Sequence, residues 1–462
     1  MPQDPTGCAR YNPPMPLETP SSSPSNPRHA TDARGPIAFV LGGVVGASIF
    51  AIASLGQQNR GMDEDLSFYR EVRDLVGTEF VQERTREELL VSAVEGIVAD
   101  LDVYSRFYSG DELARIERAT SGTFLGLGAI FAPPISKGQL LFPMPDSPAQ
   151  RSGLGVGERI LSVDGKPLAE MGEGEFEALL GHLDGTPLAL VVESVAGEQR
   201  TLQIEPESIA DPTVRHGKML DDSVGYLAIT SFSRRTLEEF DIEVGQLIAE
   251  GMSELVIDLR NNPGGVLRIA LGIANRFIDE GPLLYTDSRA GREETTADES
   301  EAHHLGMPLV VLIDGDSASS SEVLAGTLQD HRVAVIVGTP SYGKGTVQTL
   351  TTLGAPHSIL KVTTAFYTTP SGRQIDRHYS GDQDAAITPD LLVPLEPAAV
   401  QDIRAQLSSY SPPRIYRAAV ADLLAGSSST HADSTASALN DRQLASAHQL
   451  IRSKIVAPLT DQ

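Results

Sequence analysis

The strongest constraint on the fold of this chain is an alternation of short apolar strands with helices in its second half. The expected strands are GYLAI from Gly225, Glu254–Leu259, Pro308–Asp314 and VAVIV before Gly338. The expected helices are Thr236–Ala249, Leu267–Phe277 and Ser321–Asp330. A strand–helix alternation of this kind predicts an α/β core. The chain has 462 residues, too many for one ordinary core, so further domains are expected.

The N-terminal part has a different character. Residues 1–34 are rich in Pro and Ser and are predicted to be disordered. The segment Pro36–Leu55 carries no charge and is long enough to cross a bilayer as a helix, which takes about 20 residues. A cleaved signal peptide and a buried soluble helix are the alternatives. Because Arg28 and Arg34 precede the span, the positive-inside rule places the N-terminus in the cytoplasm and the main body outside.

Other patterns mark the remaining regions. Helical spacing begins near Asp63, and Thr85 with Glu88 three residues later forms a capping box that predicts the start of a second helix. Short strands and Gly turns are expected from Gly122 to Ile204. Near the C-terminus, 426–435 is interpreted as a Ser-rich linker and Asp441–Ile455 as a last amphipathic helix.

Composition argues against several classes of function. The formal net charge of −26 argues against a nucleic-acid surface, because phosphate binding needs Lys and Arg. Cys8 is the only cysteine, which excludes an internal disulfide framework and a Cys-rich zinc site. His303 and His304 are adjacent and cannot form the i, i+4 pair of a zinc helix, so they are interpreted as a loop. No metal and no cofactor are implied.

Ser319 and Lys344 offer a nucleophile and a base without any histidine. The lysine can accept a proton at neutral pH only if burial brings its pKa well below the ordinary value of about 10.4. On the residues alone, Ser319 with Glu322 also fits a plain helix-capping box, and Lys344 fits a solvated loop lysine. Composition also cannot distinguish Ser319 from its neighbours Ser317, Ser320 and Ser321.

The segment GTPSYGKG, residues 338–345, nearly matches the phosphate loop of nucleotide-binding proteins. Gly345 stands where that motif needs the magnesium-binding Ser or Thr. The following TVQTLTTL has β character, whereas a phosphate loop opens a helix. A nucleotide-binding function is therefore disfavoured.

From about Asp63 to Val393 the sequence resembles the carboxyl-terminal processing proteases, also called tail-specific proteases, of peptidase family S41. The motifs, in the order of the family, are LDVYSRFYS, SPAQRSGLGVGERILSVDG, GYLAITSF, DLRNNPGG, DGDSASSSEVLAG, LQDH, YGKGTVQT and FYTTPSGRQI. Val103 departs from the family pattern, which usually has proline there. NDRQLASAHQLI resembles the C-terminal tail more weakly. The ordered set is far more specific than any one block.

The resemblance implies roles for particular residues. Ser319 matches the nucleophile, Lys344 the general base and Gln348 the residue that orients the lysine. Glu322 and Asp330 match polar support positions near this dyad. The amide of Ser320, with Gly264 or Gly265, matches the oxyanion hole, and Gly265 is slightly preferred. Physically, a serine between a strand end and a helix N-terminus lies beside free amides that can stabilise an oxyanion.

A PDZ-like segment would supply substrate binding. FLGLG resembles the carboxylate-binding loop of a PDZ domain, formed by Leu125, Gly126, Leu127 and Gly128. Its glycines would let backbone N–H groups converge on a terminal carboxylate while the peptide adds as a strand to the sheet edge. The alternative is a Gly-rich turn in a β-domain.

The expected fold class is an α+β multidomain protein. By resemblance it has an α/β protease core of the ClpP/crotonase-like type, an inserted PDZ domain and an N-terminal helical region. The predicted divisions are 1–34 disordered segment, 35–58 transmembrane anchor, 60–118 helical region, 119–206 PDZ domain, 215–395 protease core and 396–462 helical tail with its linker.

The predicted function is that of a membrane-anchored serine endopeptidase with an extracytoplasmic, periplasmic body. It would cleave proteins near their C-termini after the PDZ domain captures the free tail. The expected partners are protein or peptide C-termini and the membrane, without nucleic acid; a homo-oligomer or an adaptor is left open. The alternatives are a catalytically inactive PDZ scaffold and a Ser–Lys amidase acting on small amides.

Overall fold

The computed structural model describes residues 64–172, 174–354, 358–382, 384–426 and 441–453, which divide into two units at Leu89 and Leu90. The first unit contains a helix over residues 64–79 and the start of α2 (Arg86–Ala99). The predicted capping box is confirmed: the Thr85 N–H donates to Glu88 at 2.8 Å, and the Glu88 N–H donates to the Thr85 hydroxyl at 3.2 Å.

The predicted membrane span Pro36–Leu55 and the predicted disordered segment 1–34 lie outside the described residues. Among the helices that the structure does describe, none combines the length and the apolar character that crossing a membrane requires.

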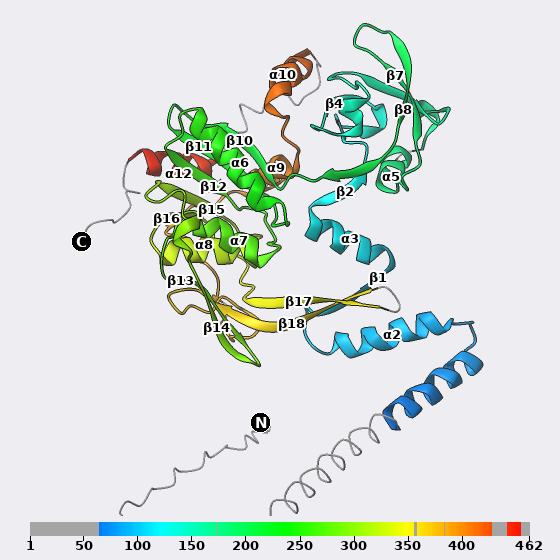
Figure 1. The fold of residues 1–462 in the computed structure, drawn as a ribbon, viewed down its shortest axis with the longest axis vertical. Helices are drawn as coiled ribbons and strands as arrows, with labels where there is room; N and C mark the ends of the chain where they lie inside the picture. Colours follow the sequence, from blue (N-terminus) through cyan, green and yellow to red (C-terminus); the bar gives the residue numbers. More distant parts are fainter. Residues whose placement is uncertain (1–63, 173, 355–357, 383, 427–440, 454–462) are drawn as a thin grey trace, which may run out of the picture. The chain divides into compact units, whose positions relative to one another are not determined.

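The second unit is built on a six-stranded sheet in the order β10-β11-β12-β15-β16-β19 (Figure 1). The strands are β10 (Val214–Met219), β11 (Val224–Ile229), β12 (Glu254–Asp258), β15 (Leu309–Ile313), β16 (Ala334–Gly338) and β19 (Leu391–Leu392). The strands from β11 to β19 are parallel, and β10 is antiparallel at one edge. The intervening helices are α6 (Thr236–Ala249), α7 (Leu267–Asn275) and α8 (Ser320–Asp330). The predicted strand–helix alternation is confirmed.

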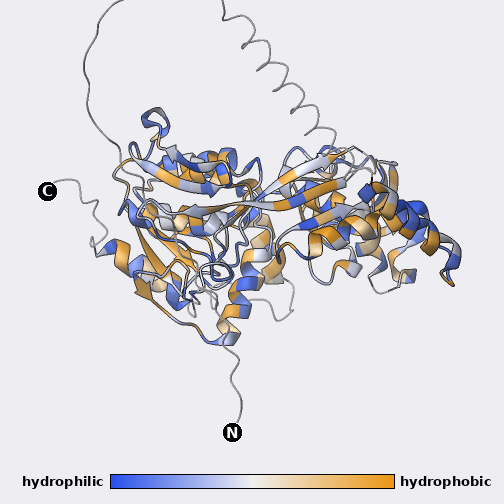
Figure 2. Ribbon diagram, turned by 90° about the horizontal axis from the view of Figure 1, so that it is seen from below, coloured by the Kyte–Doolittle hydropathy of each residue, from blue (hydrophilic) through white to orange (hydrophobic). Residues whose placement is uncertain are grey.

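Helices cover both faces of this sheet. Alternate residues of a strand point to opposite faces, so Leu227 packs with α6, α7 and α8, whereas Tyr226 packs with α9 (Pro397–Ser408) and α12 (Arg442–Arg452). A parallel sheet buried on both faces explains why its strands are continuous apolar runs. In Figure 2 the helices carry both apolar and polar segments, as expected for helices with one face against a core.

The second unit also contains an antiparallel sheet. Its path is β1-β18-β13-β14, and β17 also pairs with β18. Its strands are β1 (Arg106–Ser109), β13 (Pro282–Ser288), β14 (Gly291–Thr296), β17 (Thr346–Leu353) and β18 (Ser358–Thr368). The sheet therefore joins a strand from the early part of the chain to the hairpin that follows Lys344. Pairing between such distant segments brings the LDVYSRFYS motif to the core.

A β-rich domain with its own apolar core follows α3 (Gly110–Ser121). Its strands are β2 (Thr123–Gly126), β3 (Ala129–Phe131), β4 (Leu140–Pro143), β5 (Arg159–Val163), β6 (Lys166–Pro167), β7 (Leu188–Glu193), β8 (Gln199–Ile204) and β9 (Glu207–Ala210). Its short helices are α4 (Pro148–Arg151) and α5 (Glu175–Gly181). The predicted succession of short strands and Gly turns is confirmed.

The C-terminal segment contacts both the β-rich domain and the main sheet. Between α9 and α10 (Arg417–Gly426), the Tyr416 hydroxyl accepts a hydrogen bond from the Gln150 amide at 2.9 Å. Asp441 caps α12 and forms an ion pair with the buried Arg260 at 2.7 Å. The side chain of Asp258 at the end of β12 forms a second ion pair with Arg260 at 2.6 Å.

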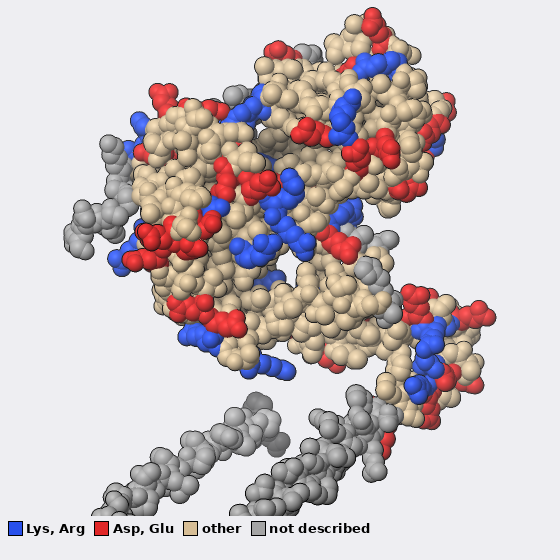
Figure 3. Space-filling model, viewed as in Figure 1, with Lys and Arg blue, Asp and Glu red and all other residues tan. Residues whose placement is uncertain are grey.

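Figure 3 shows the many acidic side chains of the visible surface.

Candidate active site

Ser319 lies between the end of β15 and the start of α8, at the carboxyl edge of the parallel sheet. Ligands of open α/β sheets bind at this edge. Its backbone has φ 57° and ψ −116°, a conformation that L-residues rarely adopt and that the surrounding structure must hold in place. The Ser319 N–H donates to the Glu322 carboxylate at 2.8 Å. The half-buried serine thus stands at a helix N-terminus, where the helix dipole is positive.

The RNNPGG loop after β12 packs against this serine. At Gly264, which has φ +96°, an added Cβ would lie 2.9 Å from the Ser319 Cβ and 2.6 Å from the Ala318 carbonyl oxygen. Only glycine permits this close approach. The Gly264 N–H already donates to the Asn262 side chain at 2.9 Å. By contrast, the N–H groups of Gly265 and Ser320 donate to no other residue of the described chain.

The Glu322 side chain, on the first turn of α8, joins the serine and lysine loops. One carboxylate oxygen accepts the N–H groups of Ser319 and Lys344 at 2.8 and 2.9 Å. The other accepts the Ser341 hydroxyl and the Gly343 N–H, each at 2.6 Å. Burial raises the pKa of Glu322, and its hydrogen-bond donors oppose that rise. Since all four donors favour the carboxylate, this side chain fixes the two loops relative to each other.

Lys344 lies in the loop between β16 and β17 and is partly buried. Burial is the largest cause that lowers the pKa of Lys344, and the positive charge of Lys361 lowers it further. The carboxylates of Glu322, Asp376 and Asp102 act in the opposite direction but do not reverse the shift. A lowered pKa is what a lysine needs in order to serve as a general base.

The structure shows the hydrogen-bond partners of two other predicted site residues. The amide of Gln348 on β17 donates to the hydroxyls of Thr346 and Thr363 at 2.9 and 3.3 Å, rather than to Lys344. Asp330 is the last residue of α8, so this 11-residue helix, about 16 Å long, separates it from Ser319. There it binds the Ser371 N–H at 2.8 Å and the Arg373 guanidinium. The expectation that Asp330 lies near the dyad does not agree with its position at the far end of α8.

Sequence reasoning assigned no role to three residues that surround the site. Tyr104 places its ring over the Lys344 amine, with 4.7 Å between the nitrogen and the ring centroid. The Tyr367 hydroxyl donates to the Ser319 carbonyl at 3.2 Å and to the Lys344 carbonyl. Asp376 accepts the Gly345 N–H at 2.9 Å. Tyr104 belongs to LDVYSRFYS, and the other two residues lie in or beside FYTTPSGRQI. These two motifs could have pointed to the three residues.

The GTPSYGKG segment and the adjacent histidines both have the local structure that the sequence predicts. GTPSYGKG ends β16 and leads into the strand β17, so it does not open a helix as a phosphate loop would. His303 and His304 lie in a turn after Glu301, where the His304 N–H donates to the Arg276 carbonyl at 2.7 Å. The prediction that the two histidines belong to a loop is confirmed.

The FLGLG segment forms β2 and the turn that follows it. β2 pairs antiparallel with β9, with Leu125 opposite Ser208 and Gly126 opposite Glu207. Leu125 is exposed, whereas Leu127 is buried in the domain core. The carbonyls of Leu127 and Gly128 accept backbone N–H groups from residues 149 and 144 at 2.9 and 2.7 Å. The N–H groups of Leu127 and Gly128 donate to no other described residue, which leaves two adjacent donors.

Comparison with known proteins connects this site to a family. Residues 223–393 match the family model described as peptidase family S41. This range includes Ser319, Lys344 and the neighbouring residues described above, except Tyr104 and Asp102. The chain is 30% identical over 365 residues to the carboxy-terminal-processing protease of Bartonella bacilliformis, covering 77% of this chain and 82% of that protein. It is 32% identical over 321 residues to the carboxyl-terminal-processing protease of Picosynechococcus sp., covering 68% and 75%.

Among solved structures, a photosystem II D1 C-terminal processing protease is 26% identical, with a TM-score of 0.41 and coverage of 72% of this chain and 89% of that one. The sequence matches extend over most of the chain and most of the two relatives. The chain therefore belongs to the carboxy-terminal processing proteases of peptidase family S41, and it is a serine-type peptidase.

Proposed function

We propose that the protein cleaves polypeptides near their C-termini with a Ser319–Lys344 dyad. The observation that carries this proposal is the Glu322 carboxylate, which binds the backbone N–H groups of both residues. The proposal also draws support from the partial burial of Lys344, because burial lowers its pKa. Ser317 and Ser321, which the sequence left open as nucleophiles, use their hydroxyls in hydrogen bonds to the carbonyls of Leu259 and Asn262.

In the proposed reaction, the Ser319 hydroxyl oxygen attacks a peptide carbonyl carbon and the neutral Lys344 amine takes the hydroxyl proton. The carbonyl oxygen becomes an oxyanion, for which the unoccupied N–H groups of Gly265 and Ser320 are the donors. When the C–N bond breaks, the Lys344 ammonium returns its proton to the leaving amine, and an ester remains on Ser319. Water then attacks the ester and Lys344 accepts a proton from it. When the ester C–O bond breaks, the Lys344 ammonium returns this proton to the Ser319 oxygen, and the new C-terminal acid leaves.

The proposal is tested by incubating the full-length protein with candidate protein substrates and identifying the new termini by mass spectrometry. Cleavage near substrate C-termini that is absent with Ser319→Ala would support it. Binding of a peptide without any cleavage would overturn it, and would favour the inactive scaffold instead.

The β-rich domain is proposed to be a PDZ domain that captures the free C-terminus of the substrate. The supporting features are the unused N–H groups of Leu127 and Gly128 and the exposed side chain of Leu125 beside them. Adjacent free amides suit a carboxylate, and an apolar side chain suits an apolar substrate tail.

Amidating the C-terminus of a peptide substrate should therefore weaken its capture. A charge-assisted hydrogen bond contributes about 1.5–3 kcal/mol, so KM should rise by about tenfold or more while kcat changes little. The comparison is made with the same peptide carrying a free acid, and N-terminal acetylation serves as the control. Equal KM values for the acid and the amide would remove the capture role from this loop.

Anchoring through Pro36–Leu55, with the body on the extracytoplasmic side, remains part of the proposal. Its basis is the uncharged 20-residue span preceded by Arg28 and Arg34. A reporter enzyme that works only in the periplasm, fused after Leu55, should be active in a bacterial host. An inactive but stably produced fusion would overturn the proposed orientation.

A further inference from the structure

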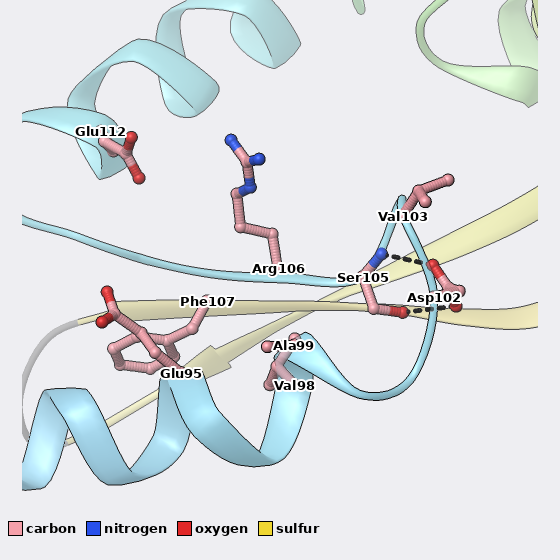
Figure 4. A pocket seen from close by; sticks show the side chains of 9 residues that line it. All are labelled: Glu95, Val98, Ala99, Asp102, Val103, Ser105, Arg106, Phe107 and Glu112. Atoms are coloured by element: carbon pink, nitrogen blue, oxygen red, sulfur yellow. Dashed lines mark hydrogen bonds between the residues drawn. The ribbon is translucent and has the colours of Figure 1, made fainter.

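The turn that precedes β1 delivers an aromatic ring to the amine of Lys344. Asp102 accepts the backbone N–H groups of Tyr104 and Ser105 at 2.7 and 2.6 Å, and also the Ser105 hydroxyl at 2.9 Å. Figure 4 shows both bonds from Ser105 to Asp102. The turn is therefore closed by a single carboxylate, and the backbone on either side of the Tyr104 ring has little freedom.

This turn is fastened to the sheet that carries the lysine loop. The Ser105 hydroxyl accepts the Thr363 N–H at 3.1 Å, and β1 pairs with β18 in the register Arg106 to Lys361. Thr363 is also the residue whose hydroxyl accepts the Gln348 amide. The turn, β18 and β17 thus form one connected framework around the amine.

The Tyr104 ring has a second neighbour with a ring. His378 makes an edge contact with it, with centroids 5.6 Å apart and planes at 77°. Asp376 accepts the His378 N–H at 2.9 Å and, with its other oxygen, the Gly345 N–H at 2.9 Å. The ring is therefore held between the lysine loop and the loop that supports it.

The Tyr104 hydroxyl does not account for this arrangement. It is buried and makes no hydrogen bond of normal geometry to a described residue, although Tyr342 lies near enough to interact with it electrostatically. The Tyr104 ring, and not its hydroxyl, makes the contact with the Lys344 amine.

A cavity of about 550 Å³ adjoins the same turn, lined by residues that include Glu95, Asp102, Arg106 and Glu112 (Figure 4). Neither Tyr104 nor Lys344 lines it. The ring therefore belongs to the site of the dyad and not to this cavity.

We propose that Tyr104 is a positioning residue, whose ring fixes the Lys344 amine in the site and shields it from water. This rests on the proposed role of Lys344 as the general base. The ring has two opposing effects on the charge of the amine. Its π-face favours an ammonium, whereas its bulk excludes the water that would hydrate one.

Burial is the largest cause of the lowered pKa of Lys344 at this site. Lys344 interacts electrostatically with Lys361 from β18, Glu322 from α8, Asp376 from the 369–380 loop and Asp102 from the turn, and His378 contacts the Tyr104 ring. Three of these groups are carboxylates that favour the ammonium, yet burial still lowers the pKa of Lys344. Removing the ring admits water, so the pKa should rise and less of the neutral base should be present at a given pH.

The test measures the pH profile of kcat/KM for the full-length protein and its variants. Activity falls as pH falls through the pKa of Lys344. Tyr104→Ala should move this inflection upward by about one pH unit or more, which lowers kcat/KM about tenfold at a fixed pH below it. Tyr104→Phe keeps the ring and should leave the inflection within about 0.3 units of wild type. Tyr285→Ala removes a ring that lies 4.7 Å from Arg292, the same ring-to-cation distance, and should leave the inflection unchanged.

A second measurement needs no turnover. In a Ser319→Ala background, brief exposure to acetic anhydride labels the neutral Lys344 amine, and mass spectrometry gives the labelled fraction against pH. Tyr104→Ala should shift this curve upward as well. An unshifted curve, a downward shift, or an equal shift in Tyr104→Phe would overturn the role of the ring. If the curve shifts as expected but Lys344→Ala retains turnover, the proposed function fails and the role of the ring in shielding the amine stands.

Discussion

Replacing Lys344 with alanine is expected to lower the turnover of a peptide substrate by at least about 10³-fold, as losing one member of a hydrolase nucleophile–base pair does. Ser319→Ala should have a loss of the same order, and the double variant should be little worse than either, because the two residues act as a unit. Peptide binding should survive, since the proposed capture loop is in the β-rich domain.

Lys344→Arg distinguishes a base from a simple positive charge. Arginine keeps the charge and much of the length, but it does not deprotonate in proteins. The variant should therefore be as inactive as Lys344→Ala. Lys166→Ala, at a half-exposed lysine of the β-rich domain that pairs with Glu175, is the matched control and should keep its turnover. Turnover by Lys344→Arg within tenfold of wild type would assign the lysine an electrostatic role and move the base elsewhere.

The largest effect on stability is expected at the buried ion-pair network around Arg260. This guanidinium binds Asp258 at 2.6 Å, Asp441 at 2.7 Å and the Gln443 side chain at 3.1 Å. The Tyr226 hydroxyl donates to Asp258 at 2.8 Å. The network ties the start of α12 to the end of β12, which leads directly into the glycine loop beside Ser319.

Asp441→Ala should lower the free energy of unfolding of the core by about 3–5 kcal/mol, because it leaves a buried charge with one carboxylate partner fewer. It also removes the α12 cap, since Asp441 accepts the Leu444 N–H at 3.0 Å. Denaturant unfolding followed by circular dichroism measures the change.

Asp316→Ala is the control for the network variant. It breaks an ion pair with Arg404 in which both side chains are more than 40% exposed, so it should cost at most about 1 kcal/mol. An unfolding free energy for Asp441→Ala within about 1 kcal/mol of wild type would show that α12 contributes little to the stability of the sheet.

The sequence was sufficient to predict the strand–helix alternation of the α/β core, and the reason is physical. Strands buried on both faces must be apolar at every position, so GYLAI and VAVIV stand out from the amphipathic helices between them. The helix Thr236–Ala249 agrees with the prediction at both ends. The capping box at Thr85 was also readable because it is local.

The site could be predicted only in part. Ser319 and Lys344 were predicted from their motifs, and Glu322 joins their loops because it lies on the first turn of α8. Asp330 matched a motif on the same helix, but helix length separates it from the serine. The contact of Tyr104 with Lys344 depends on β1 pairing with β18, and no local pattern encodes a pairing between such distant segments.

The structure, unlike the sequence, distinguishes between the two glycines that could donate to the oxyanion. Both were candidates for the oxyanion hole, and the sequence offered no way to tell which N–H was free. The structure shows Gly264 donating to the Asn262 side chain, whereas the Gly265 N–H has no partner in the described part of the chain. The slight preference for Gly265 thereby gains a physical reason, and its role remains a proposal.

The most direct test of the dyad is covalent labelling of the full-length protein with a fluorophosphonate, followed by peptide mapping. This reagent reacts with a serine that a nearby base has activated. We expect one adduct, on Ser319, in the wild type and none in Lys344→Ala. An adduct on a different serine, or equal labelling of Ser319 without Lys344, would contradict it.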